Sequence, residues 1–163
     1  MTYRAAIALA LVLVACGGEP PTPPNVLFIA VDDLRPQLGS YGESQMVTPN
    51  FDRFASRSRL FERHYVQVPT CGASRYALLT GIRPSSNEHT RNDALRDLLP
   101  KTEQETAESF AHLFRRAGYK TVSIGKIGHY VDGRIYSYEG EGAGEFEMPI
   151  SWDRRIMPYE KWG

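Results

Sequence analysis

The chain has 163 residues, of which 42% are hydrophobic and 23% are charged, a composition typical of one modest globular domain. Its 19 basic and 19 acidic residues give a formal net charge of zero. Because a nucleic-acid-binding surface needs an excess of positive charge, this balance argues against a nucleic-acid partner. Any anionic substrate must therefore be recognised by a local cluster of residues.

Residues 1–15 have the pattern of an export signal. Arg4 precedes an apolar run over 5–15, which is too short to cross a bilayer as a helix. The run ends in LVAC, which resembles the lipobox of bacterial lipoproteins, and this resemblance implies that Cys16 is lipidated and becomes the first mature residue. A plain secretory signal cleaved nearby is the alternative. Both imply export, and the lipobox places a membrane-anchored protein on the periplasmic or cell-surface side.

Residues 16–24 are rich in glycine and proline, which predicts an extended tether before the folded domain. The domain is predicted to begin at Asn25. Residues 26–31 are an unbroken apolar run, typical of a parallel strand buried on both faces. Asp32 and Asp33 follow it, at the strand end where open α/β sheets bind ligands. The alternative is that one aspartate only caps the next turn.

The next elements lead to Cys71. A helix is predicted to begin at Thr48, and a second strand over 60–68 precedes the cysteine. Residues 72–79 predict about two helical turns, which Gly81 ends. Cys71 is therefore expected at a helix N-terminus, where unpaired backbone N–H groups and the helix dipole attract an anion.

Several features indicate that Cys71 is a nucleophile. Arg75 lies four residues further on and shares its helix face. If Cys16 carries lipid, Cys71 is the one thiol left in the chain, and no disulfide can form within it. A buried structural cysteine is the alternative, but Gly72, Ser74 and Arg75 are poor neighbours in a core.

Residues 85–99 are polar and irregular, which favours a solvated loop over a substrate-contacting one. A capping-box pattern at Thr102 and Glu105 predicts a helix that Gly118 ends. Residues 121–124 then predict another buried strand. The rest of the chain, from 130 onward, is expected to form long loops, with a strand in part of it as the open alternative.

Polar groups thus follow the ends of successive predicted strands, at Asp32, Asp33, Cys71, Lys126 and His129. Because the carboxyl ends of parallel strands meet at one edge of a sheet, these side chains are expected to converge there. The pattern predicts an α/β fold with a mostly parallel central sheet flanked by helices.

Four of these sequences resemble signatures of the type I sulfatases, a formylglycine-dependent family of the alkaline-phosphatase superfamily. CGASR at 71–75 and LTG at 79–81 are similar to the family's Cys-x-Pro-Ser-Arg and Leu-Thr-Gly, with Ala73 in the place of proline. DDLRP at 32–36 and GKIGH at 125–129 resemble the iduronate-2-sulfatase branch in particular. The resemblance runs from Asn25 to about His129.

The resemblance implies a sulfuric ester hydrolase that acts on a sulfated sugar or polysaccharide. It implies that a formylglycine-generating maturation enzyme oxidises Cys71 to an aldehyde, whose hydrate attacks sulfur. It also implies a calcium ion that is bound by Asp32, Asp33 and residue 71 and polarises a sulfate oxygen.

The other implied roles belong to two cations and a histidine. By the same resemblance, Arg75 and Lys126 stabilise negative charge, and His129 assists the release of sulfate. A cysteine-dependent phosphatase is a poor alternative, because its loop between Cys and Arg is longer than the three residues found here. A phosphonate or phosphate ester hydrolase of the same superfamily, and an inactive lipid-anchored remnant, stay open.

Sulfatases that resemble this chain are several hundred residues long. The resemblance implies that further calcium ligands and the acid for the leaving group come from later parts of such proteins. Residues 25–163 are therefore expected to form only the N-terminal part of a sulfatase catalytic domain, with weak calcium binding and no turnover when isolated.

Overall fold

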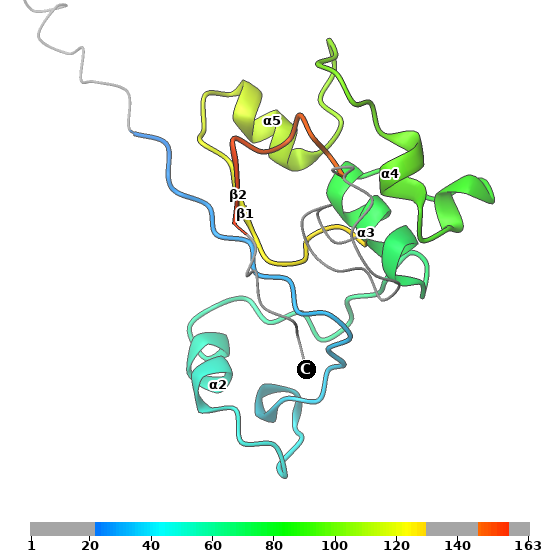
Figure 1. Ribbon diagram of the computed structural model, residues 1–163. Coiled ribbons are helices and arrows are strands. Elements are labelled where there is room, and N and C mark those ends of the chain that lie inside the picture. Colours follow the sequence, from blue (N-terminus) through cyan, green and yellow to red (C-terminus); the bar gives the residue numbers. More distant parts are fainter. Residues whose placement is uncertain (1–21, 130–146, 157–163) are drawn as a thin grey trace, which may run out of the picture. The chain divides into compact units, whose positions relative to one another are not determined.

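The computed structural model describes residues 22–129 and 147–156, and the chain divides into two units, 1–34 and 35–163 (Figure 1). The predicted signal peptide, Cys16 and most of the predicted tether lie outside the described residues. None of the helices formed by the described residues is long and apolar enough to cross a membrane.

The described part of the first unit, residues 22–34, is extended and ends in a turn at Asp32 and Asp33. The buried strand predicted over 26–31 is wrong here, because this segment has no strand pairing and its large side chains are exposed, Leu27 by 82% and Ile29 by 74%. An apolar run becomes a buried strand only when other strands pair with it and helices cover both its faces. The first unit contains no such partners among its described residues.

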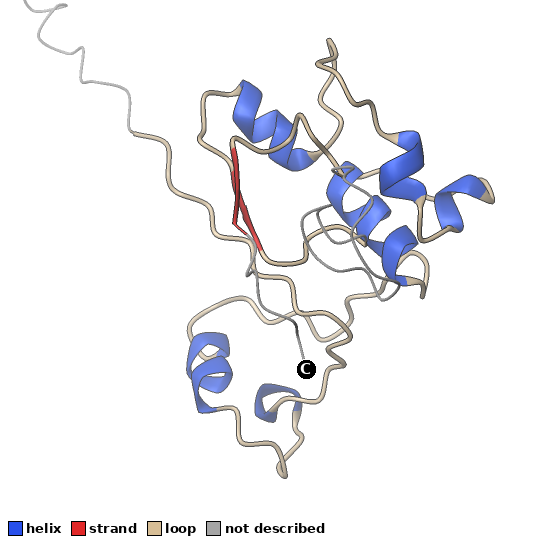
Figure 2. Cartoon of the chain, in the orientation of Figure 1, coloured by secondary structure: helices blue, strands red, loops and turns tan. Residues whose placement is uncertain are grey.

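The second unit contains short helices and two short strands, shown by type in Figure 2. Its elements in chain order are η1 (Gly39–Tyr41), α2 (Pro49–Ala55), α3 (Cys71–Thr80), η2 (Glu88–Thr90), α4 (Ala94–Leu98), α5 (Phe110–Arg116), β1 (Val122–Ile124) and β2 (Arg154–Ile156). The predictions of a helix after Thr48 and a helix after Cys71 are confirmed. The strand predicted over 60–68 is wrong, because these residues are irregular and largely exposed.

The core lies where α3 packs against α4, side by side in Figure 1. Tyr76 and Leu79 of α3 contact Ala94 and Leu95 of α4 in this core, which Met148 completes. The prediction of a solvated loop over 85–99 is therefore wrong for α4, whose Ala94 and Leu95 are fully buried. The sequence does not predict this five-residue helix, because only its first two residues are buried and charged side chains surround them in the chain.

Charged side chains surround the buried start of α4. Asp93 pairs with Arg91 at 3.7 Å and with Arg96 at 3.4 Å, and Asp97 pairs with both arginines as well. These arginines hold the pKa of the Asp97 carboxyl below its usual range, chiefly through the hydrogen bond from Arg96. Exposed ion pairs of this kind add little stability each, so the apolar contacts of α4 with α3 are what hold the helix in place.

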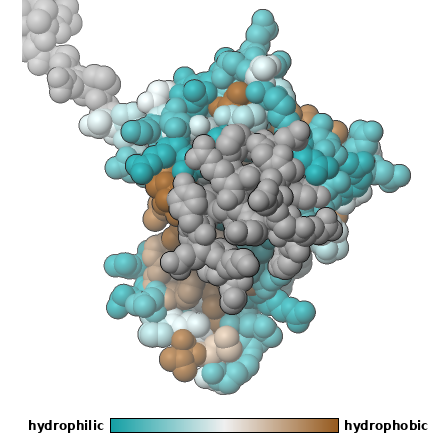
Figure 3. Space-filling view, in the orientation of Figure 1, coloured by the Kyte–Doolittle hydropathy of each residue, from teal (hydrophilic) through white to brown (hydrophobic). Residues whose placement is uncertain are grey.

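The two strands form a parallel sheet in which Val122 pairs with Arg154 and Ile124 pairs with Ile156. This confirms a small parallel sheet with helices, which is the part of the predicted architecture that the described residues contain. β1 was predicted to be a buried strand, and this is wrong for two of its three residues: Ser123 faces the interior, whereas Val122 and Ile124 are exposed. Large hydrophobic side chains are exposed in both units, and such residues appear brown on the face shown in Figure 3.

α5 begins later than the sequence predicts. Its N-cap is Ser109, whose Oγ accepts a hydrogen bond from the backbone N–H of His112 at 3.0 Å. Thr102 and Glu105 lie in the irregular segment before the helix, so the predicted capping box is wrong. The predicted stop is close to correct, because Gly118 follows the C-cap with a positive φ of 89°.

A buried polar network joins α5 to the sheet. The Ser151 hydroxyl donates to Glu108 Oε1 at 2.6 Å and lies 2.8 Å from the Ser109 hydroxyl. The Thr121 hydroxyl donates to the Ser151 carbonyl at 2.9 Å, which extends the network to the residue before β1. Polar groups removed from water cost stability unless they are hydrogen-bonded, so this network specifies how the chain before β2 meets α5.

We expect Glu108→Gln to raise the melting temperature of the protein at pH 7. Burial raises the pKa of the Glu108 carboxyl, although the hydrogen bond from Ser151 acts in the opposite direction. The folded protein therefore holds this proton more tightly than the unfolded chain does, and ionisation costs stability as pH rises above the ordinary glutamate pKa of about 4.3. A gain of about 1 kcal/mol corresponds to roughly 2–4 °C.

Thermal unfolding from pH 3 to pH 8 measures this effect. The difference between Glu108→Gln and the wild type should disappear near pH 3, where the carboxyl is protonated in both states. The exposed Glu105→Gln is the matched control and should show no such pH-dependent gain. A lower melting temperature for Glu108→Gln at pH 7 would mean that the ionised carboxylate stabilises the fold.

Candidate active site

Cys71 is the first residue of α3, as the sequence predicts. The backbone of Thr70 is extended, with φ −136° and ψ 130°, and its carbonyl accepts the first helical hydrogen bond from the Ser74 N–H at 2.8 Å. Cys71 is half-buried and is not in a disulfide. Its side chain is thus partly accessible at the end of the helix that carries the positive dipole.

The other end of α3 shows what the LTG sequence does in this fold. Leu79 is almost fully buried in the core. The Thr80 hydroxyl donates to the Tyr76 carbonyl at 2.6 Å and accepts from the Ile82 N–H at 3.1 Å. Gly81 has a φ of 73°, which favours glycine, and its N–H reaches the Ala77 carbonyl at 2.9 Å. These residues end α3 and anchor it, so they support the position of Cys71 from the far end of its helix.

Arg75 binds the backbone of the loop that follows β1. Its guanidinium donates to the Ile127 carbonyl at 2.8 Å and to the Lys126 carbonyl at 3.5 Å. The loop begins at Gly125, which has a φ of 73° and donates its N–H to the Ile156 carbonyl at 2.9 Å. The structure therefore brings Arg75 to the loop that contains Lys126 and His129, and in Figure 1 this loop reaches α3.

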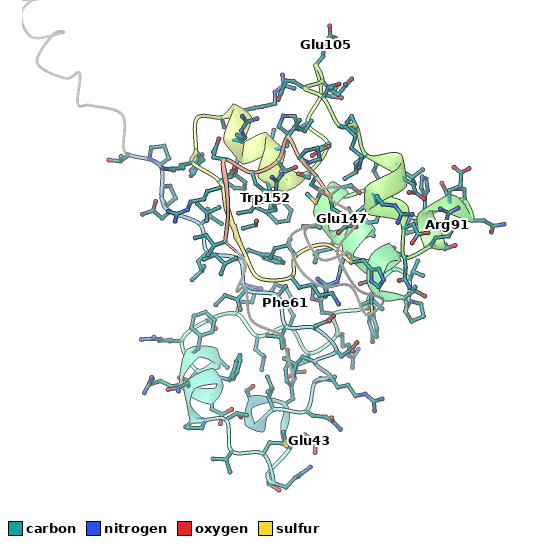
Figure 4. All side chains as sticks on the ribbon, viewed as in Figure 1. Glu43, Phe61, Arg91, Glu105, Glu147 and Trp152 are labelled. Carbon is teal, nitrogen blue, oxygen red and sulfur yellow. The ribbon has the colours of Figure 1, made fainter. Side chains whose placement is uncertain are left out.

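Lys126 is exposed in this loop and His129 is half-buried. Glu147 lies against the same loop, because a Cβ atom placed on Gly128 would collide with its carboxylate. Figure 4 labels Glu147 close to α3. Sequence reasoning missed Glu147, because it comes after a long glycine-rich segment without a periodic pattern.

Asn92 is a second residue whose place beside the site the sequence did not reveal, because the segment of 85–99 was predicted to be a solvated loop. Its side-chain oxygen Oδ1 accepts a hydrogen bond from the Gly72 N–H at 2.9 Å. No local sequence pattern predicts this contact, because the two residues are 20 positions apart. The loop of 85–99 therefore reaches the residue next to Cys71.

Asp32 and Asp33 form an exposed turn in the first unit, and Asp33 has a left-handed backbone with φ 53°. Two carboxylates on adjacent exposed residues are hard oxygen donors of the kind that calcium prefers. The donor chemistry therefore fits the implied ion. The convergence of these two aspartates with Cys71, Lys126 and His129 stays a prediction.

The second unit thus contains a helix that carries Cys71 and Arg75, and a loop, held by Arg75, that carries Lys126 and His129. A partly accessible cysteine with cationic side chains on the same helix and on a loop bound to it is suited to an anionic substrate. This arrangement rests on contacts between elements far apart in the chain.

Comparison with known proteins agrees with this chemistry. Residues 24–154, more than half of the chain, match the family model described as Sulfatase. No solved structure is significantly similar to this one.

Three relatives illustrate the similarity. Iduronate 2-sulfatase of Homo sapiens is 39% identical over 106 residues, which cover 64% of this chain and 18% of that protein. A sulfatase of Formosa agariphila is 35% identical over 147 residues, covering 80% of this chain and 27% of that protein. N-acetylgalactosamine-6-sulfatase of Homo sapiens is 37% identical over 118 residues, which cover 67% of this chain and 23% of that protein. The chain thus spans about a fifth to a quarter of the length of these relatives, and it belongs to the sulfatase family.

Proposed function

We propose that the protein hydrolyses sulfuric esters, with residue 71 as its nucleophile. The observation that carries the proposal is the position of Cys71 at the N-terminus of α3, on the helix whose Arg75 binds the loop of Lys126 and His129. The match to the sulfatase family supports the same reaction.

Two groups would complete the chemistry. Formylglycine, made from Cys71 by a maturation enzyme, would supply a hydrated aldehyde with a hydroxyl that can attack sulfur. Calcium supplies Lewis-acid polarisation, and Asp32 and Asp33 are the residues that would hold it, together with residue 71.

The chain's own residues have separate tasks in this proposal. Arg75 fixes the loop after β1 and adds positive charge one helical turn from residue 71. Lys126, exposed in that loop, offers a second cation to the sulfate oxygens. His129 lies three residues beyond it and would take the proton of the hydrate's second hydroxyl, the one that carries no sulfate, as sulfate departs from the first.

The substrate class is proposed from the relatives. Both named human relatives are sulfatases of sugar units, iduronate in one and N-acetylgalactosamine in the other. We therefore propose a sulfated sugar or polysaccharide as substrate. A phosphate or phosphonate ester is the second candidate, since the same cations would also stabilise a phosphoryl group.

Export and membrane attachment are further parts of the proposal. They rest on the LVAC sequence that ends in Cys16, after a charged start and a short apolar run. Cys16→Ala should move the protein from the membrane fraction to the soluble fraction. An unchanged distribution and precursor size would rule out lipidation at this residue.

The reaction is tested with protein produced from the complete coding sequence in its native host, where the maturation enzyme is present. Turnover of an aryl sulfate and of the matching aryl phosphate is measured with calcium and after chelation. We expect a preference for the sulfate and a loss of rate on chelation. A preference for the phosphate would favour the second candidate, and no turnover of either ester would indicate an inactive remnant.

A further inference from the structure

We propose that Asn92 is a positioning residue for the nucleophile at residue 71, an inference that rests on the proposed sulfatase function. The observation behind it is the hydrogen bond that the Gly72 N–H donates to Asn92 Oδ1 at 2.9 Å. This bond joins the loop between η2 and α4 to the first turn of α3.

The bond replaces a missing helix cap. The first N–H groups of a helix have no partner within it, and an N-cap side chain usually accepts one of them. Thr70 is the N-cap of α3, but its side chain makes no capping hydrogen bond. Asn92 accepts the N–H of the second helical residue instead, from 20 positions away.

The acceptor is held firmly in place. η2 and α4, which flank Asn92, both contact α3, and His89 of η2 stacks on Tyr76 of α3 with ring centroids 5.2 Å apart. The backbone of Asn92 comes so close to α3 that a Cβ atom on Gly72 would collide with it. The contact is therefore set by two packed elements and by the absence of a side chain at residue 72.

Fixing the Gly72 N–H affects residue 71 directly. The two residues share one planar peptide unit, so a fixed N–H also fixes the Cys71 carbonyl and limits rotation about its Cα–C bond. The direction of the side chain at residue 71 follows from that backbone. Because a nucleophile misplaced by about 1 Å can lose roughly a hundredfold in rate, we expect the Asn92 contact to matter for turnover.

The choice of an amide is also consistent with an anionic substrate. Aspartate caps a helix as well as asparagine does. A carboxylate at residue 92, however, would place a negative charge beside the helix end where a sulfate is proposed to bind. The amide supplies the acceptor oxygen without that charge.

The test compares three variants in protein from the complete coding sequence, matured in the native host. Asn92→Leu keeps the approximate size and removes the acceptor, and we expect its kcat to fall about tenfold to a hundredfold. Asn92→Asp keeps the acceptor, so kcat should stay within about twofold while KM for an aryl sulfate rises about tenfold. Asn87→Leu, at the residue before η2, is the matched control, because its side chain makes no capping bond, and it should behave like the wild type.

Amide hydrogen exchange provides a readout that is independent of turnover. Exchange at the first turn of α3 should become faster in Asn92→Leu and stay protected in Asn92→Asp. Wild-type kcat in Asn92→Leu, or equal kcat losses in both Asn92 variants, would overturn the proposal. If the wild type itself does not hydrolyse the sulfate, the proposed function fails. Unchanged exchange in Asn92→Leu would instead show that the Asn92 contact is absent.

Discussion

Replacement of Cys71 by alanine should abolish sulfate ester hydrolysis, with a loss of kcat on the order of 10⁴-fold or more. The substitution removes the thiol on which maturation acts, so no aldehyde can form at residue 71. It should leave the melting temperature nearly unchanged, because Cys71 is only half-buried and its helix is anchored through Leu79 and Gly81. Steady-state turnover of an aryl sulfate by protein from the native host measures the effect.

Cys16→Ala is the matched control, since it removes the other cysteine of the chain. It should change membrane association and leave turnover intact. Mass analysis of the wild-type peptide that contains residue 71 should show an aldehyde in place of the thiol. Substantial turnover by Cys71→Ala, or a thiol at residue 71 in fully active protein, would show that another group attacks the ester.

Arg75→Lys should lower kcat/KM by about 10²-fold, although it keeps the positive charge. One guanidinium nitrogen, Nη1, donates to the carbonyls of both Ile127 and Lys126, and the shorter lysine side chain would not carry its ammonium as far as these two oxygens. The loop of 125–129 would lose its link to α3, and Lys126 and His129 would lose their fixed positions relative to residue 71.

Amide exchange at 125–129 distinguishes loss of this link from loss of charge. Exchange should become faster in Arg75→Lys, and it should not change in Arg57→Lys, which alters an exposed arginine after α2. Unchanged exchange together with reduced turnover would mean that Arg75 acts on the substrate alone. Unchanged turnover would mean that the loop does not need this contact.

Local sequence patterns predicted the helices best. α2 begins at Pro49, directly after Thr48, and α3 begins at Cys71 and ends before the left-handed Gly81, because proline and glycine act through backbone preferences within a few residues. The same kind of pattern failed at Thr102 and Glu105. There the cap of α5 is Ser109, whose hydroxyl also lies 2.8 Å from that of Ser151, a residue far along the chain.

Strands were predicted less well, since a strand exists only through its partner. The apolar run of 26–31 has no pairing and is exposed, whereas β2 forms around Arg154 and Arg155 in a stretch where loops were favoured and a strand was left open. β2 pairs with β1, which lies far earlier in the chain, and its own residues carry little apolar pattern. Hydrogen bonding between distant segments decided the sheet.

The sequence by itself determined the chemistry of the candidate site. It identified Cys71 at the start of a helix, Arg75 on that helix, and Lys126 and His129 after a strand, because residue types and local spacing are properties of the chain alone. Only the tertiary structure decided which groups hold these residues. Arg75 binds the carbonyl of Ile127, and Asn92 binds the N–H of Gly72. Both contacts join segments whose meeting depends on how α3, α4 and β1 pack, which no short window of sequence encodes.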